Sequence, residues 1–280
     1  MERAMIVGVY DFIGYSLCRH LLDMGIEVTG VHPIGEQDHD YTEEKRLEIG
    51  RNANFSEISL IEWQGIEEVD FVFVTLFELF LEQNRTEKGL EEVFAILQSK
   101  HCTKQRTALL LPAFFAQENA KLETTSVKLA QFLDNAKSSV LVIYLPTIYG
   151  PWQPENCFFQ KTMNHPSREK EAVLGIDPLE WTEDCLYIDD TVNCIRKMAE
   201  SGEQGQFMLA SGEPDKWQEC ARKLLGKHPS IPVTRGELVK IRRGINVKKL
   251  KKNEDVHTGL DKQREQYSRI LASRVRSDFP

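Results

Sequence analysis

The first 31 residues of the chain spell a strand, a turn, a helix and a second strand, and this unit constrains the fold more than any other feature. Residues 4–9 (Ala-Met-Ile-Val-Gly-Val) are an apolar run typical of a buried parallel strand. Residues 13–24 carry apolar side chains at helical spacing, and Gly25 follows them where a helix end favours glycine. Residues 27–31 form the next strand. Two parallel strands joined by a helix require a right-handed crossover, with helices covering the sheet.

The alternation of strands and helices continues to about residue 150, and shorter segments follow Pro151. This pattern predicts an α/β fold, namely a Rossmann-type doubly wound, mostly parallel sheet. We expect a nucleotide-binding domain over residues 1–150 and a smaller C-terminal substrate lobe over residues 151–280. Further strands are expected at residues 58–63, 69–74, 107–111, 139–145 and 206–210, and further helices at residues 87–98, 121–135, 188–201, 214–225 and 258–274.

Composition excludes several classes of function. The net charge of −8 argues against general affinity for nucleic acid or anionic membranes. The six cysteines are dispersed without a Cys-x-x-Cys pair, so neither a metal site nor a disulfide scaffold is expected. The longest apolar stretch, near residues 71–77, ends at Glu78 and is far shorter than the ~20 residues of a membrane span. A strand begins directly after the N-terminus and leaves no room for a signal peptide, so we expect a cytoplasmic protein.

The turn between the first strand and the first helix is a candidate anion site. Residues 8–14 read Gly-Val-Tyr-Asp-Phe-Ile-Gly. Gly8 lets the strand turn tightly, and Gly14 lets the helix pack closely on the strand. The unpaired N–H groups at the helix N-terminus would then face a phosphate. We therefore expect Gly8, Asp11, Phe12, Ile13 and Gly14 to bind a nucleotide cofactor.

Four stretches together resemble the extended short-chain dehydrogenases, the NAD-dependent epimerase/dehydratase family. Residues 8–14 resemble its Gly-x-x-Gly-Phe-Ile-Gly turn, and residues 145–151 (Leu-Pro-Thr-Ile-Tyr-Gly-Pro) resemble its strand ending in Tyr-Gly-Pro. Residues 185–192 resemble its Tyr-Val-Asp-Asp-Val block, and the segment from Gly259-Leu260 resembles its C-terminal Glu-Gly-Leu helix.

The resemblance implies a Rossmann half that holds NAD or NADP and a C-terminal lobe that holds a nucleotide-sugar-like substrate. It also implies a homodimer through the long helices of the Rossmann half, here residues 87–98 and 121–135. No nucleic-acid or membrane partner is expected.

The cofactor positions depart from the family pattern. Asp11 stands where the family has its middle glycine. Two like charges about 4 Å apart repel by roughly 4 kcal/mol at an effective dielectric near 20, so Asp11 disfavours a dinucleotide diphosphate. Either Asp11 caps the helix, or its carboxylate occupies the anion site as an internal stand-in for phosphate. His32 follows the second strand, where family members hold the ribose. It could contact a 2′-phosphate, pair with Asp11 or be an ordinary loop residue.

The catalytic positions depart further. The family uses a Tyr-x-x-x-Lys pair, and the matching stretch here runs from Thr124 to Lys128. Lys128 is in register, either as the cofactor-binding lysine or as a plain surface lysine, but Thr124 replaces the proton-transferring tyrosine. An aliphatic hydroxyl is a far weaker acid than a phenol with a pKa near 10. The hydroxyl residue that the family places after the preceding strand is also missing, because residues 111–114 read Leu-Pro-Ala-Phe.

A basic segment lies near the C-terminus. Residues 235–252 contain eight Lys and Arg side chains and a single acid, Glu237. The resemblance implies that Arg242 or Arg243 binds a nucleotide diphosphate, and the alternative is a solvated basic face.

Taken together, these residues favour an epimerase/dehydratase-like protein without the usual tyrosine-based catalysis, acting as a ligand sensor or scaffold. The alternative is an active NAD(P)-dependent epimerase, dehydratase or reductase with an atypical site.

Overall fold

The computed structural model describes residues 1–32, 41–59, 69–81, 91, 106–118, 129, 133, 140–164, 175–177, 179–226 and 240–277. The strands are β1 (Arg3–Val7), β2 (Glu27–His32), β3 (Phe55–Ser59), β4 (Phe71–Thr75), β5 (Arg106–Pro112), β6 (Val140–Leu145), β7 (Thr147–Tyr149), β8 (Cys185–Tyr187), β9 (Gly205–Ala210) and β10 (Asn246–Lys249). The α-helices are α1 (Phe12–Asp23), α2 (Thr42–Ile49), α3 (Phe77–Leu81), α6 (Phe158–Asn164), α8 (Ile188–Ser201), α9 (Lys216–Leu225) and α10 (Val256–Ser277), and a short 3-10 helix spans Ala113–Ala116.

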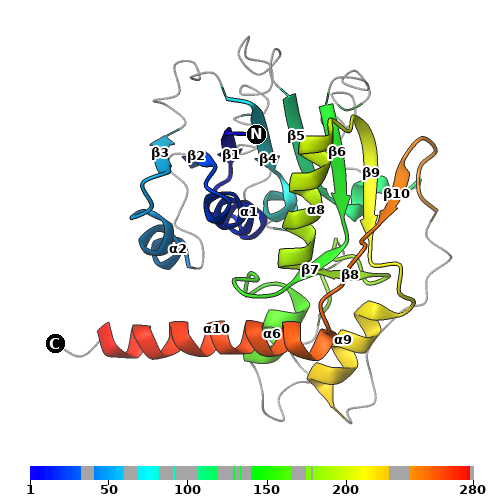
Figure 1. Cartoon of the computed structure of the whole chain (residues 1–280). Coiled ribbons are helices and arrows are strands. Elements are labelled where there is room, and N and C mark those ends of the chain that lie inside the picture. The colour runs from blue at the N-terminus through cyan, green and yellow to red at the C-terminus, as the bar shows by residue number, and fades with distance from the viewer. Residues whose placement is uncertain are drawn as a thin grey trace.

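Eight strands form one parallel sheet in the order β3-β2-β1-β4-β5-β6-β9-β10 (Figure 1). This order confirms the predicted doubly wound Rossmann-type fold. In this fold the first strands are added to one side of β1 and the later strands, starting with β4, to its other side, so the switch point lies between β1 and β4. Ligands of such sheets bind at the carboxyl ends of the strands beside this switch point. Strands β9 and β10 come from the C-terminal half yet extend the same sheet, and the boundary at residue 150 stays a prediction. Strands β7 and β8 pair separately.

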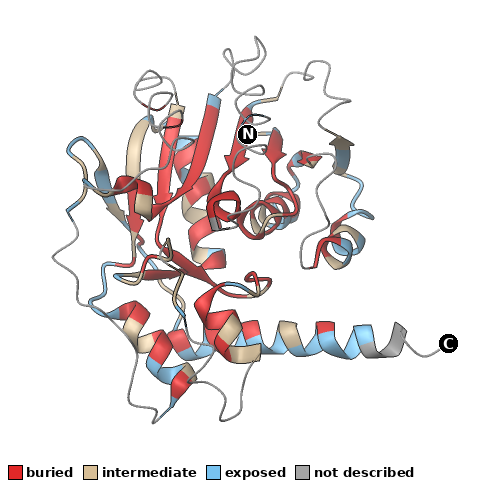
Figure 2. Cartoon of the chain, turned by 180° about the vertical axis from the view of Figure 1, so that it is seen from behind, coloured by how far each residue is buried: buried red, intermediate tan, exposed pale blue. Residues whose placement is uncertain are grey.

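The core lies on both faces of the sheet because alternate side chains of each strand point to opposite sides. On one face, Ile6 and Phe73 belong to a cluster that includes the apolar residues of α1 and α8. On the other face, Met5 and Val72 belong to a cluster that includes Leu129. Seen from behind, the central strands are buried and the outer half of α10 is exposed (Figure 2).

The structure refines two predicted boundaries. Helix α1 ends at Asp23, and Gly25 has the predicted left-handed conformation with φ +76°. Strand β3 begins at Phe55 instead of residue 58, because it pairs in register with β2 from Val28 onward.

Most of residues 87–98 and 121–135 lie outside the described residues, so the homodimer stays a prediction. In the described part of the chain, no helix is both long and apolar enough to cross a membrane.

Candidate functional site

The turn from β1 into α1 has the close approach that its glycines predict. Gly8 adopts φ +80°, and its N–H donates to the carbonyl of Val31 at 3.0 Å. A Cβ added to Gly14 would lie 2.0 Å from the carbonyl oxygen of Gly8. Only glycine at residue 14 therefore allows α1 to cross the end of β1 at this distance. The N-terminus of α1 is held at the carboxyl edge of the sheet, beside β4.

Asp11 is the N-cap residue of α1, but its side chain bends back across the turn. Its Oδ2 accepts a hydrogen bond from the Thr75 hydroxyl at 2.9 Å and lies 2.5 Å from the position of a Cβ on Gly8. The side chain makes no capping hydrogen bond to α1, so the first of the two alternatives, capping by this side chain, is not what the structure has. Asp11 precedes the helix with extended backbone, and its carboxylate is engaged by the residue that ends β4.

Glu78 supplies the anion at the N-terminus of α1. Its Oε1 accepts a hydrogen bond from the backbone N–H of Phe12, the first residue of the helix. The Glu78 side chain is buried and follows directly after β4, in the first turn of α3. An internal carboxylate therefore lies where a helix N-terminus in this kind of turn would hold a phosphate.

Asp11 was the residue considered as an internal anion from the sequence, as one of two alternatives, and Glu78 was not among the candidates. The signal was present, because Glu78 is the one charged residue within residues 71–80, a segment that is buried throughout. A charge in such a segment needs a strong internal partner.

Tyr10 fills the space beside the end of β2. Its ring is fully buried and packs edge-on against His32, with 5.3 Å between ring centroids. The Tyr10 hydroxyl donates to Glu57 at 2.6 Å, and the Arg46 guanidinium lies 4.9 Å from the ring centre. Burial, reinforced by the bond to Glu57, raises the pKa of Tyr10. Buried Lys45 donates to the Tyr10 carbonyl at 2.7 Å. His32 thus contacts a side chain of the turn at the place where a ribose would be expected.

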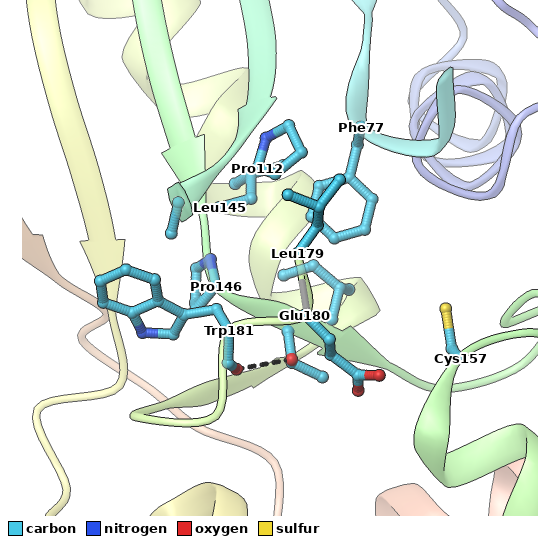
Figure 3. A pocket seen from close by; sticks show the side chains of 11 residues that line it. Phe77, Pro112, Leu145, Pro146, Cys157, Leu179, Glu180 and Trp181 are labelled. Carbon is cyan, nitrogen blue, oxygen red and sulfur yellow. Dashed lines mark hydrogen bonds between the residues drawn. The ribbon is translucent and has the colours of Figure 1, made fainter. Parts of the chain in front are cut away.

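A small cavity lies where β4, β5 and β6 end (Figure 3). Its volume is about 10 Å³, close to the smallest space that holds one water molecule. The Thr147 hydroxyl donates to the Trp181 carbonyl at 2.7 Å across its wall. The wall is mostly apolar and is formed by Phe77, Pro112, Ala113, Leu145, Pro146, Thr147, Ile148, Cys157, Leu179, Glu180 and Trp181.

Glu180 is the titratable group of this cavity that sequence analysis missed. Its Oε2 accepts from the Phe158 N–H at 3.0 Å, whereas its Oε1 is buried without a hydrogen-bond partner among the described residues. Burial raises the pKa of Glu180 to about 7, and the bond from Phe158 offsets part of that rise. Burial also raises the pKa of the neighbouring Cys157 thiol, with Glu180 and Glu78 adding to the effect. The thiol is therefore protonated and a poor nucleophile.

Three of the four stretches that carry the family resemblance pack against one another. The rings of Tyr149 and Tyr187 lie 5.6 Å apart, and a Cβ on Gly259 would lie 2.7 Å from the Tyr149 ring. The buried Gln263 side chain accepts from the Gly150 N–H at 2.9 Å. These stretches thus join β7, β8 and α10 into one packed unit below the sheet (Figure 1).

The remaining candidate residues are not gathered at this edge. Arg242 donates to the Tyr144 hydroxyl at 2.9 Å, and its backbone N–H donates to the Ala116 carbonyl at 2.8 Å. Arg243 is exposed in the following turn. Neither arginine lines the cavity. Thr124 and Lys128 lie outside the described residues. The described part of the chain also contains no group of three or more His, Cys, Asp and Glu residues that could hold a metal ion.

Comparisons with known proteins relate the whole chain to one group of enzymes by structure. No protein-family profile matches the sequence. The uncharacterised Bacillus subtilis protein YjaV is 33% identical over 81 residues, which are 28% of this chain and 44% of YjaV, so the match spans less than half of that relative.

Solved structures match nearly the full length. UDP-glucuronic acid 4-epimerase from Bacillus cereus, in complex with NAD, has a TM-score of 0.64 at 14% identity and covers 95% of this chain and 99% of its own. dTDP-glucose 4,6-dehydratase from Bacillus anthracis, also with NAD, has a TM-score of 0.63 at 12% identity, with 96% and 97% covered. MoeE5 with UDP-glucose and NAD has a TM-score of 0.60 at 14% identity, with 96% and 99% covered. The chain therefore has the fold of the NAD-dependent epimerases and dehydratases, the extended short-chain dehydrogenases.

Proposed function

We propose that this chain is a non-catalytic protein of the epimerase/dehydratase fold, whose dinucleotide subsite is filled by its own side chains. The observation that carries the proposal is the hydrogen bond from the Phe12 N–H to the Glu78 carboxylate. This bond uses the N–H group and the positive end of the helix dipole that a dinucleotide diphosphate would need.

The charges around the turn support the proposal and do not fit a dinucleotide. A diphosphate at the N-terminus of α1 would meet the carboxylates of both Asp11 and Glu78. One such repulsion at about 4 Å costs roughly 4 kcal/mol at an effective dielectric near 20, which weakens binding by about a thousandfold. The buried ring of Tyr10 also occupies space beside the end of β2, where the ribose would lie.

The residues at the catalytic positions of the family also support a non-catalytic protein. Thr124 replaces the tyrosine of the family pair, and residues 111–114 contain no hydroxyl. A hydroxyl of threonine needs a strong base to take part in proton transfer, whereas a phenol can be tuned by its surroundings. On this proposal neither NAD nor NADP binds, a nucleotide-sugar is not converted, and the protein acts through a sensed ligand or a protein partner.

Calorimetric titration with NAD⁺, NADH, NADP⁺ and NADPH tests the proposal. We expect no binding of any of the four up to millimolar concentration by the wild-type chain. We expect Asp11→Gly with Glu78→Gln to gain affinity, because this pair of changes removes both charges while the glutamine can still accept from Phe12. Glu183→Gln is the control, since it removes one charge from an exposed residue. Micromolar binding by the wild type would overturn the proposal, and no gain in the double variant would remove the role given to the carboxylates.

An active enzyme with an atypical site is the second candidate, and Glu180 favours it. A carboxyl with a pKa of about 7 suits general acid–base catalysis at neutral pH, and Glu180 lines a cavity at the ligand edge of the sheet. Turnover of UDP-glucose or UDP-glucuronic acid with NAD by the wild type, lost in Glu180→Gln, would establish this candidate in place of the first.

A further inference from the structure

The edge of the sheet at β10 carries a concentration of positive charge that neither candidate function uses. Residues 240–252 contain seven Lys and Arg side chains and no acid, in a chain with a net charge of −8. Arg242 bonds the Tyr144 hydroxyl, and Lys248 forms an ion pair with Glu203. The other five are exposed and form no ion pair with described residues: Lys240, Arg243, Lys249, Lys251 and Lys252.

The backbone of β10 also faces outward. Among the strands that the structure describes, β10 is the last of the sheet, and it pairs in parallel with β9 (Figure 1). The Leu250 N–H donates to the Ala210 carbonyl of β9 at 2.9 Å. Since successive peptide groups of a strand point to opposite sides, the N–H and C=O groups of Val247 and Lys249 point away from β9. The Val247 side chain is 56% exposed, although it is a large apolar residue.

We propose that the edge of β10 binds an extended acidic segment of a partner protein, which adds to the sheet as a further strand. The outward backbone groups of Val247 and Lys249 would supply the ladder hydrogen bonds, and the exposed Val247 side chain would supply an apolar contact. Acidic side chains of the segment would meet Lys249, Lys251 and Lys252, while the negative charge of the rest of the chain would repel it elsewhere.

A peptide fits this surface better than a nucleic acid. Sites for single-stranded nucleic acid combine positive charge with aromatic side chains on which bases stack. The large exposed apolar residues of the described chain are Met24, Leu47, Val247 and Leu271, and none is aromatic. A nucleic-acid backbone also cannot continue a ladder of peptide hydrogen bonds.

The inference goes beyond the proposed function and stands apart from it. Strand β10 is separated from β1 and its turn by β9, β6, β5 and β4. Peptide binding at β10 and dinucleotide binding at the turn are therefore measured independently. The outcome of one measurement does not decide the other proposal.

Fluorescence anisotropy with a labelled peptide of alternating Glu and Val tests the inference on the full chain. The same peptide with Lys in place of Glu is the control ligand. We expect the acidic peptide alone to bind, with an affinity that falls as salt is added. Lys249→Glu with Lys251→Glu and Lys252→Glu should abolish binding. The matched control makes the same change of charge on α8 and α9, with Lys197→Glu, Arg222→Glu and Lys223→Glu, and should retain it.

Two measurements separate strand addition from diffuse charge attraction. Val247→Pro removes an outward N–H without removing a bond to β9, and we expect it to weaken binding by about tenfold. In the wild type, the peptide should shift the NMR amide signals of Val247 and Lys249 more than those of the other exposed residues.

Three results would overturn the inference. The first is an acidic peptide that does not bind, which would leave the lysines as a device against edge-to-edge aggregation. The second is unchanged affinity in Val247→Pro together with unmoved amide signals at residues 247 and 249. The third is single-stranded DNA that binds this edge more tightly than the peptide.

Discussion

The carboxylate of Glu78 accepts a hydrogen bond from the backbone N–H of Phe12, so a residue that follows β4 caps the helix that follows β1. The contact joins segments 66 residues apart at the switch point of the sheet. It satisfies one of the free N–H groups that every helix has at its N-terminus. In a protein that binds a dinucleotide at this turn, the phosphates of the ligand accept hydrogen bonds from such N–H groups.

Removing the Glu78 carboxylate should destabilise the fold. Glu78→Ala leaves the buried Phe12 N–H without its acceptor, and we expect a loss of about 1–3 kcal/mol in the free energy of unfolding. Glu78→Gln keeps an acceptor oxygen and should lose less. Urea denaturation gives both values, with the exposed Glu118→Ala as the control. Equal stability of Glu78→Ala and the control would contradict the capping role.

The close approach at Gly14 gives a second prediction. An added methyl group would lie 2.0 Å from the Gly8 carbonyl oxygen, so α1 and the turn would have to move apart. We expect Gly14→Ala to lower the unfolding free energy by about 1–3 kcal/mol or more, as overpacking does in tightly packed sites. Gly175→Ala is the matched control, because a Cβ there meets no atom of the described residues within 4 Å. The midpoints of thermal unfolding of the two variants measure this difference. Similar midpoints would show that the turn accommodates the added methyl group at little cost.

The buried amide network at α10 gives a third prediction. The Gln263 side chain accepts from the Gly150 N–H and donates to Gln153 at 2.8 Å and to Gln160 at 2.9 Å. Gln263→Ala would leave the Gly150 N–H and the Gln160 Oε1 buried and unsatisfied, at a cost of about 1–3 kcal/mol for each group that water cannot reach, whereas Gln153 keeps its bond from the Gln160 N–H. We expect faster proteolytic cleavage within α10 as well as lower stability.

The half-exposed Gln266 provides the control for this prediction. It lies on the same helix, so Gln266→Ala should leave both the cleavage rate and the stability unchanged. Equal cleavage of the two variants would argue against the network as the anchor of α10.

The fold could be predicted from the sequence because its signals are local. The apolar runs of β1, β4 and β6 and the spacing of α1 follow from residues close together in the chain. The glycines of the β1–α1 turn, Gly8 and Gly14, also reveal their role locally, since a tight turn and a close helix crossing each require one.

The candidate site could be predicted only in part, because its partners are distant in sequence. The departure of Asp11 from the family glycine is visible in the sequence, but its bond to Thr75 depends on how the end of β4 meets the turn. Glu78 was not among the sequence candidates, since no local rule links Glu78 to Phe12. Glu180 was missed for the same reason: its burial arises only when its loop packs below the sheet against Phe158.

The raised pKa of Glu180 predicts a specific dependence of stability on pH. The folded chain holds its proton up to a pKa of about 7, whereas the unfolded chain releases it near the ordinary value of 4.5. The folded state thus binds more protons between these values, so this group lowers the unfolding free energy as the pH rises, by about 3 kcal/mol in all.

Glu180→Gln has no such proton, and its amide oxygen can still accept from Phe158. At pH 5 the variant should therefore match the wild type, and at pH 8 it should be the more stable by up to about 3 kcal/mol. Urea denaturation of both proteins at the two pH values measures this difference. The other titrating groups contribute equally to both proteins, so their contributions cancel in the difference. The exposed Glu183→Gln is the control for the loss of one carboxylate. A difference from the wild type that is the same at both pH values for Glu180→Gln would mean that the Glu180 carboxyl ionises freely in the fold.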